Sequence, residues 1–185
     1  MNDAPTADLQ RPFPLVDQVL AAHADVLGAD ATAYRNHVYR GLSYFVALAA
    51  DGAEPPQSVL VAAAFHDLGI WTDRTFDYLE PSTRAALAYL SSRGLDALGP
   101  EVTALIGEHH KLRAYRGPHA RNVELFRRAD LVDLSWGASR AGLPRELVRS
   151  VKAAFPDAGF HARLLSLAAK QFLEHPLRPL PMVRW

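Results

Sequence analysis

The sequence contains no cysteine among its 185 residues. This absence excludes disulfide bonds, zinc sites built from thiolates and iron–sulfur clusters ligated by cysteine. It is also typical of a reducing compartment, so we expect a cytoplasmic protein. The N-terminal stretch MNDAPTADLQRPFP agrees with this expectation, because it lacks the charged and then apolar order of a secretion signal.

An excess of charge of either sign is missing as well. Lysine plus arginine number 20 and aspartate plus glutamate also number 20, so the formal net charge is zero. A nucleic acid polymer is therefore not an expected partner, since affinity for polyanions comes largely from surplus cationic side chains. No apolar run approaches the length of a membrane span, so we expect no membrane partner. A small-molecule substrate is the expected partner, and a homodimer remains open.

Alternating strand patterns and Asn-Gly hairpin signals are absent, and helices separated by glycine and proline are indicated instead. We therefore predict an all-α fold, a single globular domain over residues 1–185 with about seven to eight helices. Its core covers about 14–175, with extended termini at 1–13 and 176–185. The expected helices are about 14–27, 31–50, 55–69, 81–94, 99–112, 121–137, 143–155 and 161–175.

In the stretch SVLVAAAFHDLGIW, residues 58–71, His66 and Asp67 directly follow a run of apolar side chains. Two further polar residues, His37 and Asp130, fall within other amphipathic helices. A charged group in such a helix is costly unless something compensates it, and helices that each contribute an imidazole or carboxylate to one point make a metal site. The alternative is that each is a hydrogen-bonded core residue, with Asp130 paired to a neighbouring arginine.

The ordered set His37, His66-Asp67 and Asp130, together with the turn HDLG, resembles the HD-domain superfamily of metal-dependent hydrolases. The resemblance covers about residues 34–135. It implies an HD-like helical bundle in which these four residues bind a divalent cation. Asp67 would also polarise the attacking water.

A second group of candidates lies in EHHKLRAYRG, residues 108–117, where His109 and His110 are expected on the fifth helix. Members of the superfamily that bind two metals use further histidines before the last aspartate. His109 or His110 could therefore bind a second ion, or act as the acid that protonates a leaving group. No histidine lies between His66 and His109, which favours one ion, while Asp77 or Glu80 could complete a second site or contact substrate.

Three cationic residues are candidates for binding a substrate phosphate. Arg40 lies one helical turn after His37, Lys111 follows the histidine pair, and Arg74 follows the HD pair. His110 or Lys111 would stabilise charge on the leaving group. Asp133, one turn after Asp130, could orient a ligand histidine through its second nitrogen.

The resemblance and the donor set together predict a metal-dependent hydrolase, favoured as a phosphohydrolase of a nucleotide or another small phosphorylated metabolite. The expected cofactor is manganese, iron, cobalt or zinc, because two imidazoles make magnesium a poorer match. Alternatives within the superfamily are a di-iron oxygenase, an enzyme like the nitrile or cyanamide hydratases, and a non-catalytic regulatory domain that binds a nucleotide.

Overall fold

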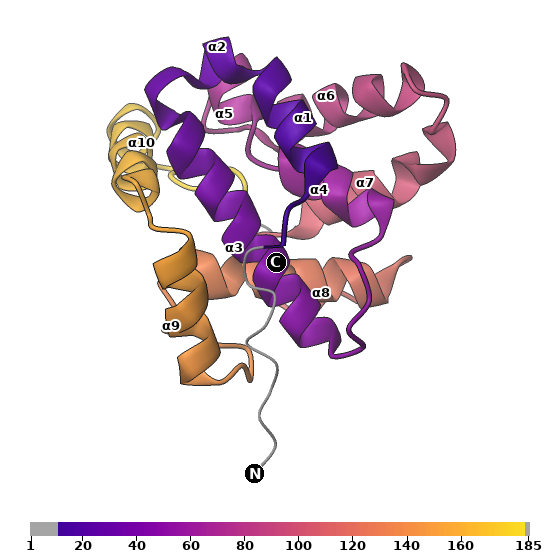
Figure 1. Ribbon diagram of the computed structural model, residues 1–185. Helices are drawn as coiled ribbons and strands as arrows, with labels where there is room; N and C mark the ends of the chain where they lie inside the picture. Colours follow the sequence, from indigo (N-terminus) through magenta and orange to yellow (C-terminus); the bar gives the residue numbers. More distant parts are fainter. Residues whose placement is uncertain (1–10, 184–185) are drawn as a thin grey trace.

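The computed structural model describes residues 11–183, and within them the predicted all-α fold is confirmed, with eight helices of nine to nineteen residues in one bundle (Figure 1). The eight are α1 (Pro14–Ala22), α3 (Ala31–Ala49), α4 (Gln57–Phe65), α6 (Leu79–Ser91), α7 (Gly99–Glu108), α8 (Ala120–Leu134), α9 (Arg145–Ala154) and α10 (Phe160–Glu174). The shorter elements are α2 (Ala24–Leu27), α5 (Gly69–Thr72) and two 3₁₀ turns, η1 (Gly28–Asp30) and η2 (Asp96–Leu98).

Helix α4 carries the apolar run and lies in the interior of the bundle. Six of the seven side chains from Val59 to Phe65 are buried, and the helix packs against α1, α3, α6 and α7. A helix that is apolar on every side is stable only when neighbours cover it all round. Its three consecutive alanines, residues 62–64, allow these neighbours to approach closely. The end of α4 is therefore placed deep in the protein.

Helices α3 and α8 form the other close pair of the bundle, although they are almost 90 residues apart in the chain. Helix α3 buries ten of its nineteen residues, and α8 buries seven of its fifteen. Figure 1 shows α8 crossing α3 near the lower half of the bundle. This crossing brings polar side chains of both helices toward the end of α4.

The first helix was expected to continue to Leu27, but it breaks at His23. The His23 ring donates from Nδ1 to the carbonyl of Val19 at 2.8 Å, and the backbone N–H of His23 bonds to Leu20 instead. The side chain thus takes the acceptor that a continuing helix would use, as polar side chains near the backbone often do.

The third helix was expected to run to Gly69, but α4 ends at Phe65 and Gly69 begins α5. A Cβ atom on Gly69 would lie 2.7 Å from the carbonyl oxygen of Tyr78 and 2.9 Å from Cβ of Pro81. Glycine is needed there because α5 packs directly on the first turn of α6. The close approach also places Tyr78 beside the HD turn.

The predicted extended termini are only partly described, because residues 1–10 and 184–185 lie outside the described range. Residues 175–183 form turns and contain no helix, and Met182 among them is buried. Within residues 11–183, none of the helices combines the length and the apolarity that crossing a membrane requires.

Candidate functional site

The candidate metal ligands come from four parts of the bundle and meet at one buried point. His37 lies in the middle of α3, and His66 caps the end of α4, with Asp67 next to it. Asp130 lies on α8, and His109 lies in the turn after α7. All five are at most 5% exposed, and the half-buried His110 lies beside them, so the four sequence-predicted residues are brought together with both second-tier histidines.

Hydrogen bonds set the tautomers of three of these histidines. His66 and His109 each place Nδ1 against the backbone carbonyl three residues earlier, at 2.8 and 2.7 Å. His37 Nδ1 lies 2.7 Å from Oδ2 of Asp133, as the spacing of α8 predicted for an orienting carboxylate. Because a carbonyl or carboxylate only accepts, each Nδ1 carries a proton, and in the neutral ring each Nε2 keeps its lone pair.

The Nε2 atoms of His37 and His66 lie 2.9 Å apart. Oδ2 of Asp67 lies 3.5 and 3.4 Å from them, and Oδ1 of Asp130 lies 3.7 and 3.9 Å from them. Four electron-rich atoms repel one another unless a proton or a cation lies between them. Donors about 2.1 Å from one cation are roughly 3–4 Å apart, so this spacing suits a metal ion.

The other oxygen of each aspartate faces a second pair of histidines. Asp67 Oδ1 lies 3.5 Å from His109 Nε2, and Asp130 Oδ2 lies 3.5 Å from His110 Nδ1. Among residues 11–183, neither of these oxygens nor His109 Nε2 finds a hydrogen-bond partner, although all three atoms are buried. Unsatisfied buried polar atoms are rare in folded proteins, and a bound cation would satisfy all three. The residues therefore fit a metal, and the buried cluster could bind one.

Burial and mutual charge shift the pKa values of the cluster in different directions. Burial opposes the charged form of His37, but hydrogen bonds to Asp133 and Asp67 outweigh it and raise its pKa to about 9. Burial lowers the pKa of His66 to about 3. Burial raises the pKa of Asp130 to about 6, against the opposing effect of the histidines. One proton on His37 can thus occupy the point where a cation would bind.

Arg40 does not face an open site, which corrects the prediction that it binds substrate phosphate. It is buried, and its guanidinium donates to both carboxylate oxygens of Asp133 at 2.5 and 2.8 Å. A third nitrogen donates to the carbonyls of Phe155 and Pro156. The helical spacing placed Arg40 beside His37 correctly, but the carboxylate opposite it comes from α8. Arg40 therefore holds Asp133, and Asp133 holds His37.

Tyr78 belongs to the site, although the sequence did not single it out as a candidate. Its hydroxyl lies 2.6 Å from Nε2 of His110, and the side chain is buried. Burial, with the charges of Asp67 and Asp130 nearby, raises the pKa of Tyr78 well above its ordinary value. Tyr78 therefore keeps its proton. A tyrosine directly before a helix start, eleven residues after Asp67, is a weak signal in sequence.

The two acids that flank Tyr78 have other partners. Asp77 is exposed and lies 3.2 Å from Arg178 in the C-terminal segment. Glu80 is exposed and pairs with Arg84 one turn later in α6. These ion pairs correct the prediction that Asp77 or Glu80 contributes to a second metal site.

The remaining predicted residues lie near the surface. Lys111 is partly exposed, with its ammonium 3.5 Å from the carboxylate of Glu108, and Arg74 is exposed in the loop after α5. His109 and His110 follow α7 and do not lie within it, because that helix ends at Glu108. A role of Lys111 or Arg74 in substrate binding stays a prediction.

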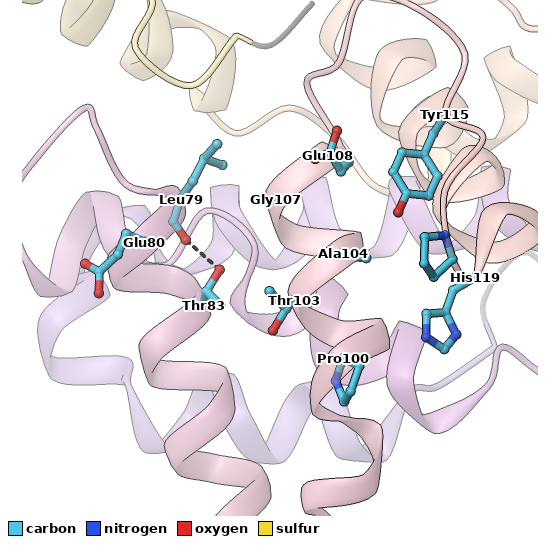
Figure 2. A pocket seen from close by; sticks show the side chains of 11 residues that line it. Leu79, Glu80, Thr83, Pro100, Thr103, Ala104, Gly107, Glu108, Tyr115 and His119 are labelled. Atoms are coloured by element: carbon cyan, nitrogen blue, oxygen red, sulfur yellow. Dashed lines mark hydrogen bonds between the residues drawn. The ribbon is translucent and has the colours of Figure 1, made fainter.

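Two cavities lie close to the cluster. The smaller, about 10 Å³, borders His37, His66 and Asp130 and has room for about one small ion or water. The larger, about 440 Å³, is a groove between α6, α7 and the loop before α8 (Figure 2). Glu108 and Leu79 line this groove, while their chain neighbours His109 and Tyr78 face the cluster. The groove therefore shares no lining residue with the cluster, but two of its lining residues directly adjoin site residues in the chain.

In comparisons with known proteins, no family model matches this chain, and no curated protein or solved structure matches it either. What the site does must therefore be argued from its geometry.

Proposed function

We propose that the protein is a metal-dependent hydrolase of the HD-domain type that acts on a small phosphate ester. One observation carries the proposal: three buried histidines with fixed tautomers direct their free nitrogens toward one another and toward two buried aspartates. Without a bound ion this arrangement would destabilise the core, because unpaired buried polar atoms are costly in a fold. A divalent cation removes the conflict.

The donor atoms divide into two sets, which favours two cations where the sequence favoured one. His37 and His66 form one set, and His109 and His110 form the other. Asp67 and Asp130 each present one oxygen to each set. Two imidazoles in each set suit manganese, iron, cobalt or zinc better than magnesium, which prefers oxygen ligands.

Charge supports a phosphate ester as the substrate. The buried charged side chains at the cluster are Asp67, Asp130, Asp133 and Arg40, which sum to a net charge of −2 when ionised. One divalent cation would neutralise them, and two would leave a surplus of +2. A phosphate monoester dianion matches that surplus, so the substrate needs no contact with Arg40.

The residues of the site have distinct roles in this proposal. A bound cation would supply a Lewis acid and make water a nucleophile near neutral pH. Asp133 holds the ring of His37 in the required tautomer. With Nδ1 directed toward the second donor set, Nε2 of His110 would carry the ring proton and donate it to the phenol oxygen of Tyr78, so the phenol proton is available to protonate a leaving oxygen.

Metal analysis and a substrate screen test the proposal. Protein purified without chelators should contain close to two equivalents of transition metal per chain, and Asp67→Ala should lose most of it. His175→Ala is the control, since His175 is exposed at the end of α10. Nucleoside monophosphates, cyclic dinucleotides and an aryl phosphate should then be assayed with added manganese or cobalt. Full metal content in Asp67→Ala would show that the site is assigned wrongly.

An iron-dependent oxygenase is the second candidate, and the surroundings of the cluster favour it. Aromatic rings enclose the histidines: Phe160 stacks on His37 at 4.1 Å, and Phe126 lies edge-on to His66 at 5.6 Å. Aromatic surroundings suit a small organic substrate better than a phosphate. Bound iron with oxygen consumption, and no hydrolysis across the phosphate panel, would select this function.

A further inference from the structure

Helix α10 has two apolar sides, and only one of them packs on the bundle. Phe160 is its single buried residue, and Leu164 and Leu167 are half-buried on the same side. Figure 1 shows α10 at the edge of the bundle. An isolated helix of fifteen residues is marginal in water, and helices in proteins are stabilised chiefly by packing. So few buried residues indicate that α10 has another partner.

The outward side of α10 carries a continuous apolar stripe. Its residues are exposed and recur at the spacing of one helix face: Ala162, Leu165, Ala169, Phe172 and Leu173. Leu165 is 71% exposed, Phe172 56% and Leu173 80%. Spacings of three and four residues are those of a helix that packs along another helix.

We propose that this stripe binds α10 of a second copy of the chain, with the two helices antiparallel about a two-fold axis at Ala169. The two exposed leucines of the helix are symmetric about that residue, since Leu165 lies four positions before it and Leu173 lies four positions after it. In this register each Leu165 meets the partner copy's Leu173. The small side chain at the axis lets the helices approach closely. A two-fold interface needs such a self-complementary surface.

The exposed area agrees with a dimer. Leu165, Phe172, Leu173 and Leu177 together expose on the order of 500 Å² of apolar side chain. The largest apolar patch on a typical monomer is about 300–600 Å² and is often functional, and a standard interface uses about 800 Å² per partner. Leu177 is fully exposed just beyond the helix and extends the stripe toward the start of the partner copy's α10.

Charge favours a second copy over a lipid surface. Helix α10 has two cationic residues, and both have anionic partners: Arg163 lies 3.3 Å from Asp30, and Lys170 lies 3.8 Å from Glu174. A helix that binds anionic membranes presents unpaired lysines and arginines beside its apolar face. The protein as a whole has no formal net charge, so two copies do not repel each other.

The test measures the mass of the full chain by sedimentation velocity between about 1 and 100 μM. We expect a species of twice the 20.3 kDa of one chain. Leu173→Glu and Leu165→Glu should sediment as monomers with unchanged circular dichroism. Leu87→Glu, at an exposed position on α6, is the matched control and should remain dimeric.

Cross-linking tests the register, because the chain has no cysteine of its own. Ala169→Cys should form a covalent dimer with a short thiol-specific cross-linker, whereas Ser91→Cys, at the end of α6, should not. A monomer at every concentration would overturn the proposal, as would a dimer that survives Leu173→Glu. Binding of the wild-type monomer to vesicles of phosphatidylglycerol and phosphatidylcholine would assign the stripe to lipid and also overturn it.

Discussion

Replacing Asp133 by asparagine should separate the two tasks that this residue performs. Its carboxylate accepts from Arg40 through two hydrogen bonds and from His37 Nδ1 through a third. Asparagine keeps the shape of the side chain but removes its charge. The substitution therefore leaves the buried guanidinium of Arg40 with only Asp157, at 3.9 Å, as an anionic neighbour, and it weakens the hydrogen bond that orients the ring of His37.

The expected losses follow from burial. Removing one partner of a buried ion pair costs about 3–5 kcal/mol, so Asp133→Asn should destabilise the fold by a similar amount. Loss of a carboxylate that orients a metal-binding imidazole lowers metal affinity about 10–100-fold. The double variant Asp133→Asn with Arg40→Met should recover part of the stability, because no unpaired charge remains. Its metal affinity should stay low.

The interactions of Asp133 with Arg40 and His37 should also contribute to the pH dependence of acid unfolding. Burial alone would raise the pKa of Asp133, but hydrogen bonds from His37 and Arg40 lower it to about 2. The folded pKa lies below the unfolded value of about 4, so the stabilisation is complete above pH 4. It is lost as the pH falls toward 2. In Asp133→Asn this part of the pH dependence should disappear.

Urea unfolding and zinc or manganese titration of wild type, both single variants and the double variant give the required cycle. If Asp133→Asn were as stable as wild type and bound metal equally well, the carboxylate would not have the role assigned to it. If the double variant regained metal affinity together with stability, the effect on His37 would be a consequence of general unfolding.

Four further predictions concern two glycines, Gly69 and Gly41, and the protons of the site. Gly69→Ala should destabilise the protein by about 1–3 kcal/mol in thermal unfolding, since its Cβ would meet the Tyr78 carbonyl at 2.7 Å. Gly41→Ala in α3, which has open space around it, should instead stabilise by about 0.5–1 kcal/mol. Tyr78→Phe should keep its metal but lower kcat about 100-fold if the pair with His110 donates a proton, and an unchanged kcat would exclude that role. Metal binding at pH 7 should release about one proton, because the pKa of His37 is raised to about 9. Metal affinity should therefore fall as the pH falls. Calorimetry in two buffers of different ionisation enthalpy measures the number of protons released.

Local features of the chain determined the helices and the identity of the donors. Glycine and proline positions predicted eight helices, because these residues act on the backbone near themselves. The same local reasoning missed the break at His23, where a side chain competes for a carbonyl. It also placed the end of a helix at Gly69, whereas Gly69 begins α5 and is needed because α6 packs closely against it.

The pattern of His37, His66, Asp67 and Asp130 was readable in the sequence because polar residues in apolar helices need partners. Which partners they find was decided only by tertiary structure. The face of α3 that carries Arg40 could be predicted from helical spacing, but the carboxylate opposite it lies 93 residues away in the chain. Helix packing therefore made Arg40 a structural support and brought Tyr78 into the site, since contacts across a core depend on crossing helices that no local pattern encodes.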